Sequence, residues 1–138
     1  ESGERSISSP ALINQWLSGI NARYAPILTA YNIAFDFGKC RNTRINLGIF
    51  NSRFCLMKTA KRKIGVLADY QAFCYENKLL TKKLRKPQMT ADSMAKYICP
   101  EMPDEPHTAL EDARDYEALI LSYILRDTTR KQLLELGQ

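Results

Sequence analysis

The stretch ILTAYNIAFDFGK, residues 27–39, decides the fold class of this chain. Its first five residues form a short apolar run that predicts a buried strand, and Asn32 follows as a turn residue. Residues 33–39 then return to a helical pattern. Because a strand that leads directly into a helix is typical of α/β proteins, we expect an α/β fold.

Asp36 is the candidate site residue in this stretch. It lies just beyond the predicted strand, among apolar neighbours, where α/β sheets place their binding sites. A carboxylate in such surroundings needs a partner, and either a divalent cation or a set of hydrogen-bond donors would serve. Two interpretations stay open at this point: a functional carboxylate, or one that caps the following helix.

Helical patterns dominate the rest of the chain. Ser9 and Pro10 mark the start of the first predicted helix, and Thr90 caps a later one. Residues 41–52 look irregular or weakly β, and residues 77–89 form a basic connector. The predicted helices cover residues 10–25, 33–39, 53–73, 90–98 and 110–126. We therefore expect a single α-rich α/β domain over residues 1–138.

The composition is that of an ordinary globular protein. The chain has 138 residues, of which 45% are hydrophobic and 25% are charged. The longest apolar runs are far shorter than a membrane span, so we expect no membrane partner. The four cysteines form no C-x-x-C pair, which favours reduced thiols over a zinc site and predicts a cytoplasmic protein.

The net charge of +5 conceals a strong internal asymmetry. Residues 39–88 carry thirteen basic side chains against two acidic ones, a balance of +11, whereas residues 89–138 carry five against ten. The basic stretch is interleaved with aromatic side chains, which favours contact with nucleic acid. The alternative is a set of solvated helix faces. The interleaved aromatic residues are Phe54, Tyr70, Phe73 and Tyr75.

The single histidine, His107, precedes Asp112 at the start of the last predicted long helix. The two side chains converge only if His107 lies on the loop before the helix, since five helical positions would turn them well apart. A titratable imidazole beside a fixed carboxylate suits a general base next to a metal ligand. The alternative is a surface histidine and a solvated carboxylate.

Two motifs resemble the DEDDh (DnaQ-like) family of 3′–5′ exonucleases. NIAFD, residues 32–36, resembles the second motif of that family, Asn-x-x-Phe-Asp after a strand. HTALEDA, residues 107–113, resembles the third, His-x-Ala-Leu-x-Asp-Ala. Both occur in the family's order with the basic stretch between them. The helix that opens at Thr90-Ala91-Asp92 is most similar to phage-type members.

This resemblance implies an RNase H-like fold and phosphodiester hydrolysis with two divalent ions, Mg²⁺ or Mn²⁺. It implies that Asp36 and Asp112 are metal ligands and that His107 activates a water. Phe35 is expected in the core rather than stacked on a base. Single-stranded DNA is the favoured substrate, with RNA as the alternative. The expected location is the cytoplasm of a bacterium or of a phage-infected host. The residues expected to contact or support the substrate are Asn32, Phe35, Lys61, Arg62, Lys82 and Lys83.

The chain departs from the family at its first motif. No Asp-x-Glu occurs upstream of Asp36, so two of the family's four carboxylates are missing from the sequence. We therefore expect an incomplete domain whose activity is deficient unless those acids come from elsewhere. The main alternative is a non-catalytic module that keeps the exonuclease fold and binds nucleic acid or a polymerase. A helical regulatory protein with chance motif matches is a weaker alternative. A polymerase or a second copy of the chain is a candidate partner.

Overall fold

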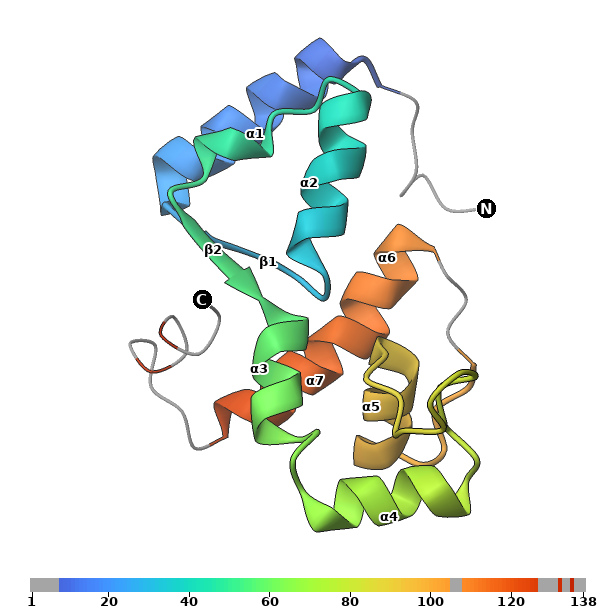
Figure 1. Ribbon diagram of the computed structural model, residues 1–138. Coiled ribbons are helices and arrows are strands. Elements are labelled where there is room, and N and C mark those ends of the chain that lie inside the picture. The colour runs from blue at the N-terminus through green and yellow to red at the C-terminus, as the bar shows by residue number, and fades with distance from the viewer. Residues whose placement is uncertain (1–7, 105–107, 127–131, 133–134, 136–138) are drawn as a thin grey trace.

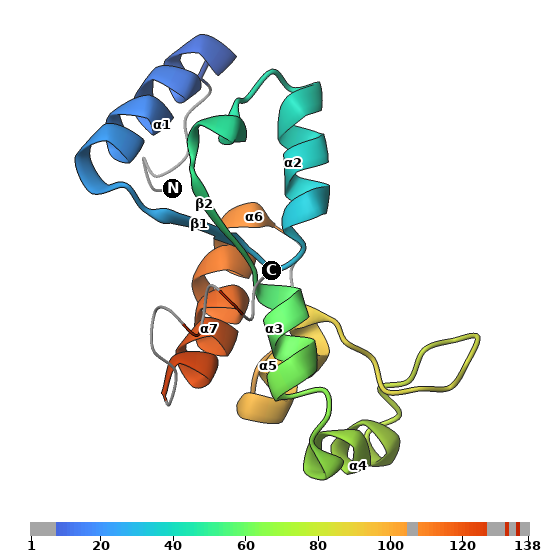
Figure 2. The same cartoon turned by 60° about the vertical axis from the view of Figure 1, so that its left-hand side comes forward.

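The computed structural model describes residues 8–104 and 108–126, together with residues 132 and 135. The fold is mixed α/β and rich in helix, as the sequence predicts. In both views α1 (Pro10–Tyr24) and α2 (Ile33–Asn42) occupy one end of the molecule, and the helices that follow the sheet occupy the other (Figures 1 and 2). No helix in the described ranges is long and apolar enough to cross a membrane.

The first helix begins where the sequence predicts. Pro10 is its first residue, and the Ser9 Oγ accepts a hydrogen bond from the Leu12 N–H at 3.2 Å. Its apolar residues recur at helical spacing, yet Leu12 and Trp16 are 59% and 67% exposed. The apolar spacing therefore predicts the helix correctly, but it does not predict that these two side chains are exposed.

The sheet consists of two parallel strands, β1 (Ile27–Ala30) and β2 (Ser52–Cys55). Ile27 pairs with Ser52 and Ala30 with Cys55, so both strands end at the same edge. The first strand was predicted. The second contradicts the prediction of helix from Arg53, because residues 52–55 gain a backbone ladder with β1 that a short local pattern cannot reveal. The 3₁₀ turn η1 (Leu47–Ile49) lies in the stretch expected to be irregular.

The predicted helix over residues 53–73 is instead β2 followed by two helices, α3 (Leu56–Lys63) and α4 (Ala68–Glu76). Between them Gly65 is buried, and a Cβ there would lie 2.7 Å from the Met89 Sδ and 2.8 Å from the Lys61 carbonyl oxygen. This close approach of backbone and side chain requires glycine. A larger residue at this point between α3 and α4 would therefore clash with the surrounding chain.

The hydrophobic core joins α3, α4, α5 (Ala91–Ile98) and the last long helix. That helix runs through α6 (Ala109–Glu111), the π-helical segment η2 (Asp112–Glu117) and α7 (Ala118–Leu125), close to the predicted 110–126. The largest fully buried side chains in the described ranges include Tyr70, Phe54, Leu56, Ile64, Met94 and Ile120. Phe54 and Tyr70 are therefore core residues, and their place among the basic residues does not make them stacking platforms for bases.

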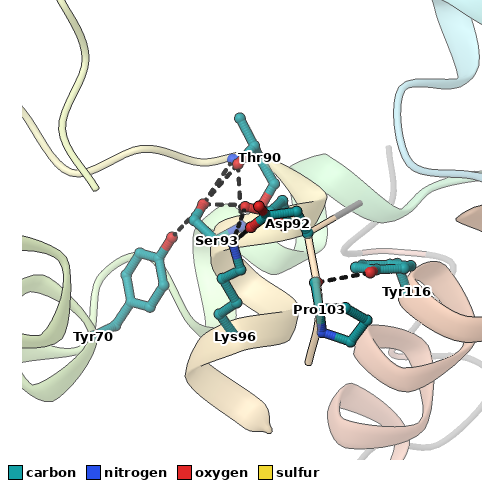
Figure 3. A network of polar contacts seen from close by, with 8 residues as sticks. Tyr70, Thr90, Asp92, Ser93, Lys96, Pro103 and Tyr116 are labelled. Carbon is teal, nitrogen blue, oxygen red and sulfur yellow. Dashed lines mark hydrogen bonds and ion pairs between the residues drawn. The ribbon is translucent and has the colours of Figure 1, made fainter. Parts of the chain in front are cut away.

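A polar network holds α5 against this core (Figure 3). Thr90 and Ser93 form a reciprocal capping box at the start of the helix, as the sequence predicts for Thr90. The buried Tyr70 hydroxyl lies 3.2 Å from the Ser93 Oγ and donates to the Gln88 carbonyl at 2.5 Å. Burial raises the pKa of Tyr70 well above its ordinary value, so this hydroxyl stays protonated and remains a donor.

Candidate functional site

Asp36 lies in the first turn of α2, just past the end of β1. The helix is capped at Asn32 without any side-chain hydrogen bond, and the Asn32 carbonyl accepts from the Asp36 N–H at 3.3 Å. Asp36 therefore is not the N-cap residue of α2. Burial raises the pKa of the Asp36 carboxyl, and a hydrogen bond from its own backbone N–H opposes that shift. A partly desolvated carboxylate of this kind gains from a bound cation.

The two neighbours of Asp36 in the predicted motif point to solvent. Asn32 is exposed, and Phe35 is 59% exposed with the Lys39 Nζ 5.1 Å from its ring centroid. The expectation that Phe35 belongs to the core is therefore wrong, because its side chain is largely exposed. An exposed ring beside a carboxylate and a lysine is a surface on which a nucleotide base can stack.

Asp112 stands at the first position of η2, and its side chain is only partly accessible. Its Oδ1 is buried and accepts no hydrogen bond from any residue within the described ranges. A buried carboxylate oxygen without a donor is unfavourable, and a cation would satisfy it. This oxygen is the strongest indication of a site in the structure.

The backbone around Asp112 is irregular in a way that the sequence does not reveal. Residues 112–117 form a π-helical turn, in which the Ala118 N–H bonds to the Ala113 carbonyl five residues back. Such turns are rare and occur often at functional sites inside α-helices. The buried Tyr116 hydroxyl donates to the Pro103 carbonyl at 2.8 Å and ties this turn to the preceding loop (Figure 3).

Asp36 and Asp112 come from elements that lie close together in the fold. In both views α6, at the start of the last helix, lies near the N-terminal end of α2 (Figures 1 and 2). Asp36 belongs to the first turn of α2, and Asp112 directly follows α6. His107 falls outside the described residues, so its predicted role stays a prediction.

The chain was compared with protein-family models, curated proteins and solved structures. No match was found in any of the three. The assignment of a function therefore rests on the motifs and on the geometry of the site.

The two carboxylates fit the chemistry of one hard divalent cation. Magnesium keeps several waters and is commonly held by one or two carboxylates together with substrate phosphates. Asp36 and Asp112 each offer a carboxylate of this chemistry, and the Oδ1 of Asp112 is buried without a hydrogen-bond donor in the described ranges. The described residues contain no group of three or more His, Cys, Asp or Glu side chains arranged for a metal. A second ion would need ligands from beyond them.

The basic stretch divides into separate surfaces rather than one. Lys61 and Arg62 are exposed in the last turn of α3, whereas Lys82 and Lys83 lie between α4 and α5 on a projecting hairpin (Figure 2). An isolated antiparallel bridge between Leu80 and Pro87 closes this hairpin. These four predicted phosphate-binding side chains are thus exposed, as phosphate contacts require. They belong to two separate parts of the fold, the end of α3 and the hairpin.

The hairpin is ordered by its own hydrogen bonds. The Thr81 carbonyl accepts from the Arg85 N–H at 3.0 Å, and the Thr81 Oγ1 accepts from the Lys86 N–H at 3.2 Å. Arg85 has a left-handed backbone with a φ of 50°, which closes the turn. Leu84 at the tip is 65% exposed among four cations. The predicted substrate contacts named only Lys82 and Lys83, although the run KKLRK, residues 82–86, contains all four cations of the tip.

Proposed function

We propose that this chain acts on nucleic acid as a divalent-metal-dependent 3′–5′ exonuclease of RNase H-like fold, with single-stranded DNA as the favoured substrate. The buried, unsatisfied Oδ1 of Asp112 carries this proposal. Further support comes from the strand–helix–strand unit β1–α2–β2, which sets Asp36 at the carboxyl edge of the sheet. The exposed lysines and arginines supply the electrostatic attraction for a phosphate backbone.

In this proposal the roles divide by side-chain chemistry. Asp36 and Asp112 hold a magnesium or manganese ion, which when bound stabilises the charge that develops on the cleaved phosphodiester. Phe35 and Asn32 flank the terminal nucleotide, and His107 takes the proton of the attacking water. Lys61, Arg62, Lys82 and Lys83 contact phosphates. In the family that the motifs resemble, an Asp-x-Glu motif supplies two further carboxylates, and the sequence contains no such motif upstream of Asp36.

The proposal predicts binding to a strand that depends on the metal. We would measure fluorescence anisotropy of a 5′-labelled oligonucleotide with the 138-residue chain, in Mg²⁺ and in EDTA. The affinity should rise several-fold in Mg²⁺, because the ion removes the repulsion between the two carboxylates and the phosphates. Asp36→Asn and Asp112→Asn should each abolish that increment.

Asp115→Asn is the matched control, since Asp115 lies in the same π-helical turn but forms an exposed ion pair with Arg114 at 2.8 Å. It should retain the increment. In the same samples any cleavage should shorten the strand from its 3′ end and disappear in both site variants. Equal binding in Mg²⁺ and EDTA, with no shortening, would contradict the proposal.

A second function is favoured by one feature, the ordered basic hairpin over residues 80–87. A non-catalytic module that binds nucleic acid, or a polymerase on it, needs exposed cations and no metal. This alternative predicts strand binding that falls steeply with salt, gains nothing from Mg²⁺ and requires neither Asp36 nor Asp112. The anisotropy experiment therefore separates the two functions.

A further inference from the structure

A pocket lies on a different face of α2 from Asp36. Its volume is about 480 Å³, within the range of small-ligand sites. Phe37, Gly38 and Arg41 of α2 line one side, and the loop over residues 44–48 lines the other. Residues 34, 37, 38 and 41 share one helix face by their spacing of three and four, whereas Asp36 neighbours Cys40. The pocket is thus separate from the carboxylate site.

The loop that forms the far wall is held in place by side chains of α1. The Asn14 amide donates to the Arg44 carbonyl at 2.9 Å and accepts from the Asn46 N–H at 2.8 Å. Asn21 donates to the Ile49 carbonyl at 3.0 Å, just beyond the pocket. Arg44 itself has a left-handed backbone with a φ of 62°, a conformation that is unfavourable for a side chain of this size. The wall is therefore a fixed structure, with Arg44 held at the pocket.

The charge of the pocket is entirely positive. Arg41 and Arg44 line it, neither forms an ion pair with a carboxylate in the described part of the chain, and no acidic side chain contributes to the lining. Arg53 lies over the Phe37 ring at 4.2 Å and adds a third guanidinium nearby. Guanidinium groups match the geometry of phosphate oxygens and bind them through two hydrogen bonds.

The rest of the lining is apolar. Phe37 and Ile45 stand beside the two arginines and offer a surface for a planar ring, while Gly38 has open space over its Cα. A ligand that carries a phosphate next to a flat apolar group fits this arrangement. We propose that this pocket binds a nucleotide, with its phosphate on Arg41 and Arg44 and its base against the apolar wall. This proposal does not depend on the carboxylates or on a metal.

The same chemistry occurs in a free nucleotide and in one unit of a strand, so the test uses both. We would titrate deoxyadenosine monophosphate, deoxyadenosine and an oligodeoxythymidine into the ¹⁵N-labelled chain in EDTA and follow amide shifts. The monophosphate or the strand should shift residues 37–48, and deoxyadenosine should not shift them at similar concentrations. Shifts with the strand alone would assign the pocket to strand binding, and shifts with both to nucleotides in general.

The matched variants are Arg41→Gln/Arg44→Gln and Arg23→Gln/Arg126→Gln. Each pair removes two exposed arginine charges, but the second lies away from the pocket, with each guanidinium over a tyrosine ring. The Arg41/Arg44 variant should weaken binding at least about tenfold, because it loses direct phosphate contacts. The Arg23/Arg126 variant should weaken it less than about twofold, because it loses none. Asn14→Ala, which frees the loop without changing charge, should also weaken binding. No shifts up to about 10 mM ligand, or equal losses in both pairs, would overturn the proposal.

Discussion

Residues 8–49 contain no buried side chain, whereas every buried residue that the structure describes lies between Phe50 and Ile124. The two regions are held by different interactions. The second has an apolar core around Leu56, Tyr70 and Ile120. The first packs the partly buried Ile27 and Tyr31 against that core, and the β1–β2 ladder and amide side chains such as Asn14 add hydrogen bonds. Regions with few buried apolar contacts open at lower free energy than the core.

The candidate binding residues therefore lie in regions that differ in burial. Asp36 and the arginine pocket belong to the less buried region, and Asp112 belongs to a helix whose residues Tyr116, Ile120 and Ile124 are buried. A metal or a strand bound between them would join the two regions and stabilise the weaker one. The following changes test how strongly the regions differ, from the largest expected effect to the smallest.

The largest contrast should come from one substitution made in each region. Leu56→Ala removes a fully buried side chain and should lower the free energy of unfolding by about 2–5 kcal/mol. Leu12→Ala removes a side chain that is 59% exposed and should change it by less than about 0.5 kcal/mol. Urea denaturation measures both. Similar losses in the two variants would show that α1 is buried in solution.

Glycine substitutions should have opposite signs in the two regions. At Gly65 a methyl group meets the Lys61 carbonyl and the Met89 sulfur, so Gly65→Ala should destabilise the protein by about 1–3 kcal/mol. Gly19 lies inside α1 with open space around it, so Gly19→Ala should stabilise by about 0.5–1 kcal/mol. Thermal unfolding followed by circular dichroism provides the comparison, and a loss at Gly19 would contradict it.

The smallest effect concerns the protonation of Asp36. Its folded pKa is raised above 3.8, so ionisation at neutral pH is unfavourable in the fold, and this penalty disappears as the pH falls through the folded pKa toward 3.8. Asp36→Asn should therefore be more stable than the native chain at pH 7 by roughly a few tenths of a kcal/mol, since solvent screens this half-exposed group. The advantage should vanish near pH 3. Denaturation without metal at both pH values checks it, and a less stable variant at pH 7 would contradict it.

The sequence predicted the helix starts and the strand that are determined by residues close together in the chain. The cap at Ser9–Pro10, the strand before Asn32 and the start of α5 at Thr90 each depend on neighbouring residues. Strand β2 was missed because its partner lies 25 residues earlier in the chain. The π-helical turn at Asp112 was missed because its residues keep an ordinary helical pattern.

The motifs supplied the candidate residues of the site but not their surroundings. The motifs named Asp36 and Asp112, yet the exposure of Phe35 and the burial of the Asp112 Oδ1 depend on which elements pack above them. Arg41 and Arg44 were missed as ligand contacts because they fall at the edge of a stretch without periodicity. The available signal was a pair of arginines, close to Asn46 and Gly48, in a stretch over residues 37–68 that contains no acidic residue.

Paramagnetic broadening by Mn²⁺ tests most directly whether Asp36 and Asp112 form one metal site. In ¹H–¹⁵N spectra of the 138-residue chain, low Mn²⁺ should broaden amides around both aspartates together and leave those of α4 sharp. Asp112→Asn should remove the broadening at both places, whereas Asp115→Asn should retain it. Broadening at only one of the two aspartates, or a pattern unchanged by Asp112→Asn, would contradict a shared metal site.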